Sequence, residues 1–165
     1  MTPIQTFALG IHRVFTTFVF VIFSFVFVCG LVYEHHAAEA ALYAVSGAVL
    51  MGIVQALKLM TRVARPDGRL VTPAGHAFPS GHAAASTFLA VMVPTLMSSV
   101  AGQSLTLLTL IIFVTLAALI CWSRLAIKVH TPLQVAAGML LGFLIPTLFM
   151  FLLPASALAG LVRLF

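Results

Sequence analysis

The segment Pro79-Ser80-Gly81-His82 marks the point where a polar stretch opens into a long apolar run. Ser80 is a favourable N-cap residue and the three alanines after His82 favour helix, so a helix is predicted to begin at or just after Ser80. A helix N-terminus offers unpaired N–H groups and the positive end of a dipole, which together bind phosphate. Gly81 lets the backbone approach a ligand closely, with His82 beside it in the first turn. Taken alone, these residues also describe an ordinary capped helix with an exposed histidine.

Basic residues and a second histidine stand at the ends of other apolar segments. Lys58 and Arg65 are seven residues apart, almost two helical turns, so they share a face with Arg62 if the helix continues. Ser123-Arg124 closes a later apolar segment, and His130 follows six residues after Arg124. Each group alone also fits snorkelling of basic side chains at the end of a membrane span, or a structural histidine.

Together, these groups could cleave a phosphate ester. Lysine and arginine neutralise phosphate oxygens, and N–H groups at a helix start bind a further oxygen. One imidazole can attack phosphorus, and the other can protonate the leaving oxygen. Asp67 is the only acidic residue near these groups in the sequence, so the cations are expected to act in place of a metal. We therefore expect no metal and no other cofactor.

The composition indicates that the elements holding these residues lie in a bilayer. The chain is 62% hydrophobic and 7% charged, with a net charge of +5, whereas soluble domains carry about 25% charged residues. No charged residue occurs between Arg69 and Arg124. The basic residues are clustered rather than spread over a broad surface, so nucleic-acid binding is not expected. Cys29 and Cys121 lie in apolar runs and are interpreted as small buried hydrophobic residues.

Five apolar segments are long enough to span a membrane. They cover residues 14–33, 38–58, 81–98, 105–125 and 132 to about 153.

The flanking segments complete this prediction. The first span is interpreted as a membrane anchor, because its apolar run is too long for a secretory signal peptide. Residues 59–80 are predicted to extend the preceding helix and then form a surface loop, and residues 155–165 to lie in the membrane interface. Gly138 and Gly142 are spaced for a close helix contact within the membrane.

Five spans place all the candidate chemistry on one membrane face. That face would hold every basic residue except Arg163, together with His76, His82 and His130. The prediction is therefore an all-α integral membrane bundle of about five transmembrane helices. It forms a single domain over residues 1–165, with the active site at a membrane face.

At this point the sequence resembles the type 2 phosphatidic acid phosphatase superfamily, whose relatives include bacterial lipid phosphatases and haloperoxidases. Three signatures occur in order: Lys58 and Arg65-Pro66 with six residues between them, then Pro79-Ser80-Gly81-His82, then Ser123-Arg124 and His130 with five residues between them. The resemblance covers about residues 45–145. Members commonly have six spans, so we expect this chain to lack one at its N-terminus.

The resemblance implies a role for each matched residue. It assigns phosphate binding to Lys58, Arg65, Ser80, Gly81 and Arg124. His130 would be the nucleophile that forms a phosphohistidine. His82 would be the acid for the leaving lipid and then the base for the hydrolytic water.

Gln134 departs from the family pattern, which usually has an aspartate four residues after the nucleophile. Members that resemble dolichyl diphosphatases also carry glutamine there, which favours polyprenyl diphosphates as substrates. Thr131 and Gln134 also form a capping-box pattern. Gln134 is therefore predicted either to close the helix start or to orient His130 by accepting its N–H, although an amide brings no charge and can flip.

The leading interpretation is a membrane lipid phosphatase acting on a lipid phosphate or diphosphate, such as a phosphatidate-type lipid or undecaprenyl diphosphate. A phosphotransferase using the same phosphohistidine, or a non-catalytic lipid-phosphate binder or transporter, are the alternatives. A haloperoxidase is disfavoured because those relatives are soluble. Expected partners are the lipid substrate and membrane lipids.

Two arguments disagree about the orientation in the membrane. Counting basic residues places the candidate site in the cytoplasm. The family resemblance instead places it on the outer face. We expect a bacterial inner membrane protein with the site facing the periplasm or outside, since cations that bind phosphate need not follow topology rules.

Overall fold

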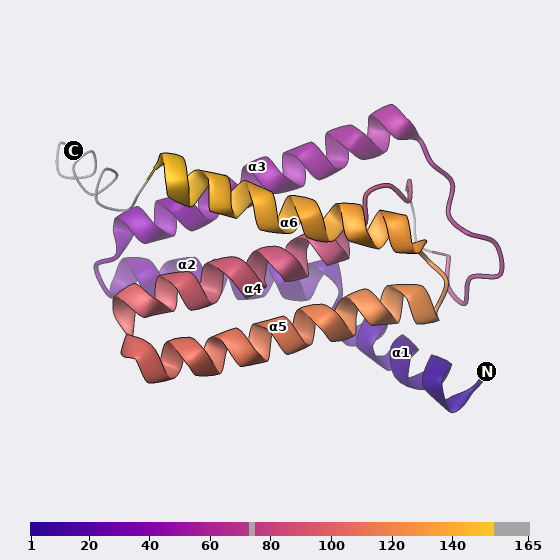
Figure 1. Cartoon of the computed structure of the whole chain (residues 1–165), viewed down its shortest axis with the longest axis horizontal. Helices are drawn as coiled ribbons and strands as arrows, with labels where there is room; N and C mark the ends of the chain where they lie inside the picture. Colours follow the sequence, from indigo (N-terminus) through magenta and orange to yellow (C-terminus); the bar gives the residue numbers. More distant parts are fainter. Residues whose placement is uncertain (73–74, 154–165) are drawn as a thin grey trace.

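Six helices make up the regular structure of the residues that the computed structural model describes, which are 1–72 and 75–153 (Figure 1). No strand occurs in these ranges. In chain order the helices are α1 (Pro3–Val14), α2 (Thr17–Tyr33), α3 (Ala37–Thr61), α4 (Gly81–Val100), α5 (Gly102–Ala126) and α6 (Pro132–Leu152).

Four of these helices are each long and apolar enough to cross a membrane, namely α3, α4, α5 from Gln103 onward, and α6. The pair α1 and α2 reaches that standard only together, across a bend of 47°. The described residues thus hold four to five candidate spans, which confirms the predicted all-α membrane bundle of about five helices. The predicted interfacial tail, residues 155–165, lies outside the described residues.

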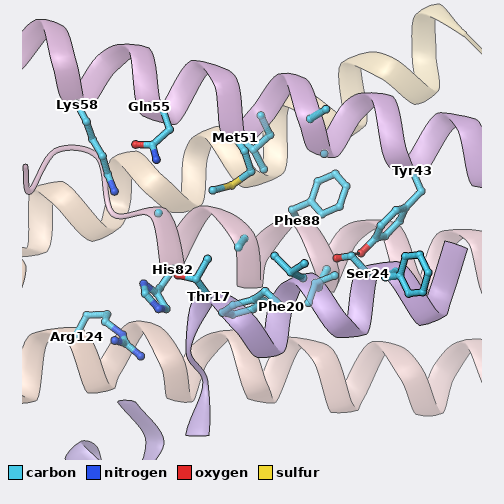
Figure 2. Close-up of a pocket in the computed structure, with 18 of the residues that line it drawn as sticks. Thr17, Phe20, Ser24, Tyr43, Met51, Gln55, Lys58, His82, Phe88 and Arg124 are labelled. Atoms are coloured by element: carbon cyan, nitrogen blue, oxygen red, sulfur yellow. Dashed lines mark hydrogen bonds between the residues drawn. The ribbon is translucent and has the colours of Figure 1, made fainter. Parts of the chain in front are cut away.

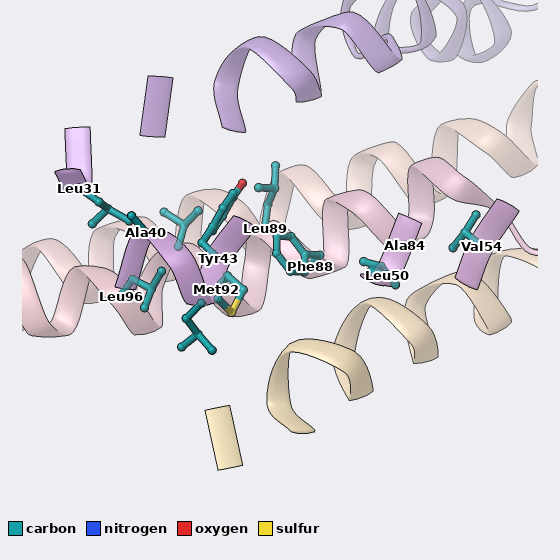
Figure 3. Close-up of a cluster of buried hydrophobic side chains, with 12 residues drawn as sticks. Leu31, Ala40, Tyr43, Leu50, Val54, Ala84, Phe88, Leu89, Met92 and Leu96 are labelled. Atoms are coloured by element: carbon teal, nitrogen blue, oxygen red, sulfur yellow. The ribbon is translucent and has the colours of Figure 1, made fainter. Parts of the chain in front are cut away.

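Helix α4 lies at the centre of the bundle, packed against α3, α5 and α6 (Figure 1). The main core joins α3 to α4 through buried side chains such as Leu50, Phe88 and Met92 (Figure 3). Large apolar side chains such as Phe25 and Ile111 are instead exposed along the outer helices. A bundle with apolar side chains both inside and outside suits lipid surroundings, and the chain is an integral membrane protein.

The closest backbone approach joins α4 to α6 at two glycines, as their spacing predicted. A Cβ added at Gly138 would clash with the carbonyl oxygen of Ser80, and one at Gly142 would clash with that of Ala84. The backbone N–H of Ser80 also donates to the carbonyl of Gln134 over 3.0 Å. The start of α4 is therefore held directly against the start of α6.

The predicted first span, residues 14–33, is wrong at its N-terminal end. Helix α1 ends at Val14, and α2 begins at Thr17 after Thr16 has adopted an extended N-cap conformation. The preceding residues form α1, whose capping box pairs Thr2 with Gln5 and places Pro3 at the first helical position. This start signal was present in the sequence but was not used.

The predicted extension of the second span is confirmed only as far as Thr61. Helix α3 ends at Thr61, because Arg62 adopts a left-handed conformation with φ of 48° and its Nε donates to the carbonyl of Leu59 over 3.3 Å. Arg62 therefore does not share a helical stripe with Lys58 and Arg65. A loop, rather than a helix, carries Arg65 to the bundle.

The glycine contacts generate a stability prediction. We expect Gly138→Ala and Gly142→Ala each to cost about 1–3 kcal/mol, because each added methyl group meets a backbone oxygen that cannot move aside. Gly52→Ala on α3 is the matched control, because nothing lies within 4 Å of its added Cβ; helix propensity then favours alanine by up to about 1 kcal/mol. Thermal unfolding in detergent would measure all three. Equal melting temperatures for Gly138→Ala and Gly52→Ala would contradict this account.

Candidate active site

An elongated cavity of about 660 Å³ extends between α2, α3 and α4 (Figure 2). One end is polar and is lined by His12, Lys58, Arg65, His82, Arg124 and His130. The other end is apolar and reaches Val28, Tyr43 and Phe88. Lys58 and Tyr43 lie fifteen residues apart on α3, so the cavity follows that helix for roughly 20 Å. It therefore joins a cationic end to an apolar arm.

The cavity brings together six of the eight residues that the sequence singled out. Those lining it are Lys58, Arg65, Gly81, His82, Arg124 and His130. They come from the ends of α3 and α5, the start of α4 and the loops that follow α3 and α5, as the predicted order of spans requires. Gln134 lies behind His130. Neither Ser80 nor His76 is among the described residues that line the cavity.

Two hydrogen bonds define the protonation of His130. The Oε1 atom of Gln134 accepts the backbone N–H of Thr131 over 3.0 Å, so the amide orientation is settled, because a backbone N–H can only donate. The same oxygen lies 3.2 Å from Nδ1 of His130, which must therefore carry the hydrogen. On the opposite edge, Nη1 of Arg65 donates to Nε2 of His130 over 3.3 Å. His130, which lines the cavity, thus carries its lone pair on Nε2, the atom that accepts from Arg65.

Burial keeps this imidazole neutral. His130 is 6% exposed, and burial together with the charge of Arg65 lowers its pKa to about 4. The ring is therefore uncharged at neutral pH, and its Nε2 carries the lone pair that a nucleophile requires. In this structure that lone pair accepts the hydrogen bond from Arg65, which must move to the substrate before Nε2 can attack.

Gln134 both caps the start of α6 and contacts His130, the two roles that the sequence offered as alternatives. Its backbone N–H donates to Oγ1 of Thr131 over 3.3 Å, and its side chain returns to the backbone N–H of Thr131, which is a complete capping box. The same side-chain oxygen contacts His130. Capping and orientation, treated as alternatives from the sequence, are combined in one atom.

Arg124 is buried, and two of its three guanidinium nitrogens make no hydrogen bond among the described residues. The residue is 1% exposed, and its Nη1 donates to Nδ1 of His12. Its Nε and Nη2 atoms have no hydrogen-bond partner among the described residues. Burying a guanidinium without a full set of acceptors is costly, so this end of the cavity suits an anion.

The start of α4 contributes in a different way from that predicted. Ser80 is the N-cap residue, yet its side chain makes no capping hydrogen bond, and Oγ is buried without a partner in the described part of the chain. Gly81 lies beside Lys58, whose Nζ is 3.4 Å from the position of an added Cβ. The ammonium group therefore stands at the N-terminus of α4, where the first-turn N–H groups have no acceptor within the helix.

His82 faces the same end of the cavity from the first turn of α4, opposite Lys58 (Figure 2). Its ring packs against the edge of Phe20, with centroids 5.9 Å apart, and lies 6.4 Å from the ring of His12. Sequence reasoning missed His12 because residues 1–13 were assigned no element, and it missed Phe20 because the first span was interpreted as a membrane anchor. The Thr2–Gln5 capping box could have indicated the helix but not the place where His12 lies.

Acidic residues are scarce around the cavity. Across the described ranges, no group of three or more His, Cys, Asp or Glu side chains lies close enough together to hold a metal ion. Glu34 and Glu39 lie at the other end of the bundle, where His36 and Glu39 pair over 3.4 Å.

Comparisons with known proteins agree with this fold. A family model described as the PAP2 superfamily matches residues 39–157. The structure is similar to the crystal structure of the first transmembrane PAP2 type phosphatidylglycerolphosphate phosphatase from Bacillus subtilis, with a TM-score of 0.82 and 20% sequence identity. That match covers 92% of this chain and 78% of the other. A comparison with curated protein sequences found no significant match. Since the family model spans well over half of the sequence, this chain belongs to the PAP2 superfamily.

Proposed function

We propose that the chain is a membrane lipid phosphatase that hydrolyses a phosphate monoester or diphosphate of a lipid through a phosphohistidine, without a metal. The observation that carries this proposal is the cavity, which joins the buried Arg124, the half-buried Lys58 and Arg65 and a neutral histidine to an apolar arm. A lipid phosphate has the same two-part chemistry. Its headgroup needs cationic donors, and its chain needs an apolar path.

Phosphate binding falls to the cationic end. Lys58, Arg65 and Arg124 all line this end, Lys58 and Arg124 from opposite sides (Figure 2), and charge-assisted hydrogen bonds from these groups would neutralise the phosphate oxygens. The first-turn N–H groups at Gly81 add donors from the helix N-terminus. Ser80 would contribute its unpartnered hydroxyl only after a small local rearrangement, because it does not line the cavity.

The first chemical step is attack by Nε2 of His130 on phosphorus. The N–P bond forms as the bond between phosphorus and the leaving oxygen breaks, and His82 donates a proton to that oxygen. A bound phosphate anion favours the protonated form of a neighbouring imidazole, which prepares His82 as an acid. Throughout the step, Nδ1–H of His130 keeps donating to Oε1 of Gln134, which holds the imidazole ring in the orientation that aims Nε2 at phosphorus.

The second step returns the enzyme to its starting state. His82, now neutral, takes a proton from water as the water oxygen attacks phosphorus. The N–P bond breaks, inorganic phosphate leaves, and His130 regains its lone pair. Arg124 can stabilise charge that develops on the phosphoryl oxygens in both steps.

The apolar arm supports a lipid rather than a soluble ester. Val28 on α2, Tyr43 on α3 and Phe88 on α4 line it, and its residues lie within candidate spans. The path is long enough for a hydrocarbon chain to lie among the helices while the headgroup stays at the cationic end. Both glycerolipid phosphates and polyprenyl diphosphates fit this description.

Phosphate release tests the proposal directly. We expect the purified protein to release phosphate from a panel of lipid phosphates and diphosphates with EDTA present, and vanadate to inhibit it. His130→Ala should abolish turnover and the acid-labile phosphoenzyme, while His36→Ala, at the other end of the bundle, should leave both unchanged.

Two results would redirect the assignment. Near wild-type turnover by His130→Ala would overturn the mechanism. Transfer of the phosphoryl group to an added lipid alcohol in preference to water would make the protein a phosphotransferase.

A second prediction concerns Gln134. We expect Gln134→Ala to lower the rate about 5–150-fold, as the loss of one orienting bond of about 1–3 kcal/mol implies. It should also lower the melting temperature, because the same oxygen caps α6. Gln134→Glu keeps that oxygen and should retain most of both properties.

Thr131→Val separates the two effects. It removes the hydroxyl that caps α6 but leaves the backbone N–H that holds the Gln134 oxygen. We expect a lower melting temperature of this variant with little loss of rate. If Gln134→Ala turned over normally, the proposed orientation of His130 would be wrong.

We further propose that the protein lies in a bacterial inner membrane with the site facing the periplasm. Thr72 and Ser98 are both exposed and lie near opposite ends of the bundle. In a background with Cys29→Ser and Cys121→Ala, an impermeant maleimide should label Thr72→Cys in intact cells and leave Ser98→Cys unlabelled. The reverse pattern would place the site in the cytoplasm, as counting of basic residues predicts.

A further inference from the structure

We infer that His12, on the N-terminal helix α1, is a positioning residue that fixes which edge of the Arg124 guanidinium faces the phosphate. This inference rests on the proposed phosphate chemistry of the cavity. It adds to the site an element outside the three signatures and outside residues 39–157, which the family model matches.

Helix α1 is docked where this role requires it. Ala8 is fully buried against Ile127 and Val129 in the loop between α5 and α6, and the Phe7 ring lies 6.1 Å from Trp122 on α5. The 47° bend after Val14 lets α1 lie across the end of α5 rather than continue the line of α2 (Figure 1). The docked helix carries His12 to the cavity.

The hydrogen bond from Arg124 to His12 divides the guanidinium into two edges. Nη1 donates to Nδ1 of His12. Nε and Nη2, which lie together on the opposite edge, have no partner among the described residues. These two parallel donors match two oxygens of one phosphate in a bidentate pair. Holding Nη1 therefore leaves the paired edge free for the substrate.

The protonation of His12 follows from the same contact. A guanidinium can only donate, so Nδ1 of His12 must carry a lone pair. The other ring nitrogen can then hold the hydrogen, and the imidazole accepts the bond without bringing negative charge. A carboxylate at this position could also accept the bond, but it would neutralise Arg124 and repel phosphate. A neutral acceptor orients the guanidinium and keeps its full charge for the anion.

The arrangement also restrains a flexible side chain before substrate arrives. An arginine side chain loses up to about 2 kcal/mol of rotamer entropy when it is ordered. His12 orders Arg124 in the empty site, so less of that ordering remains to be done at binding or in the transition state. Removing His12 should therefore weaken the action of Arg124 without removing its charge.

Single and double variants test this role. We expect His12→Ala to lower kcat/KM about 5–150-fold, the range for one orienting hydrogen bond. His12→Asn, a neutral acceptor, should restore much of the loss, whereas His12→Asp should not. In an Arg124→Ala background, His12→Ala should cause little further loss, because residues that act through one another are not additive. Arg13→Ala, the exposed neighbour on α1, is the control and should keep wild-type values.

A binding measurement keeps the test independent of turnover. Stabilisation of the fold by vanadate, read as a shift in melting temperature, should be smaller in His12→Ala than in wild type and should recover in His12→Asn. If no lipid released phosphate, the proposed function would fail, and this shift alone would decide the role of His12. If His12→Ala did not fold, His12→Leu would take its place.

Three outcomes would overturn the inference. The first is a wild-type kcat/KM and vanadate shift in His12→Ala. The second is a loss in the double variant equal to the product of the two single losses. The third is a His12→Asn variant that folds as stably as wild type but is no better than His12→Ala.

Discussion

The buried positive charge of Arg124, which forms no ion pair with a carboxylate in the described part of the chain, is the constraint that organises this protein. Arg124 is 1% exposed, and Arg65 and Lys58 face the same cavity. Such charges are costly in a low-dielectric interior unless donors find acceptors. The acceptors that the described residues present here are uncharged: the carbonyl of Val129 and Nε2 of His130 contact Arg65, and Nδ1 of His12 contacts Arg124. The remaining donors of Arg124 are left for an anion that enters the cavity.

The backbone contact between α4 and α6 is what lets two sequence motifs share this site. The N–H of Ser80 binds the carbonyl of Gln134, and the two helices approach closely only because Gly138 and Gly142 have no side chain. The same approach places the N-terminus of α4 next to the loop that carries His130. The packing of α4 against α6 therefore determines the geometry of the active site. A residue that separated the two helices would also separate the motif at the start of α4 from the loop that carries His130.

Much of this arrangement could be predicted from the sequence, because membrane spans impose an alternation of sides. Once the apolar segments were placed, Lys58, His82, Arg124 and His130 had to emerge on one face, whatever the details of packing. The predictions were wrong where the local backbone conformation determines where a helix ends or what a side chain contacts. No apolar periodicity marks the left-handed turn at Arg62 that ends α3. Nor does sequence reveal that Ser80 is not among the described residues that line the cavity. His12 was missed because its role depends on the docking of α1, which is a tertiary contact.

Gln134 and His12 answer the same electrostatic requirement. The family usually has an aspartate where Gln134 stands, and a carboxylate there would stabilise an imidazolium on His130. It would also place negative charge behind the atom that attacks an anionic phosphate. Glutamine keeps the hydrogen bond to Nδ1 and leaves out the charge. His12 does the same for Arg124. Each chemical group is thus oriented by a neutral acceptor, and the cationic end of the cavity keeps its whole positive field for the substrate. Around side chains as buried as Arg124 and His130 that field acts with little screening, which favours capture of phosphate over stabilisation of a charged histidine.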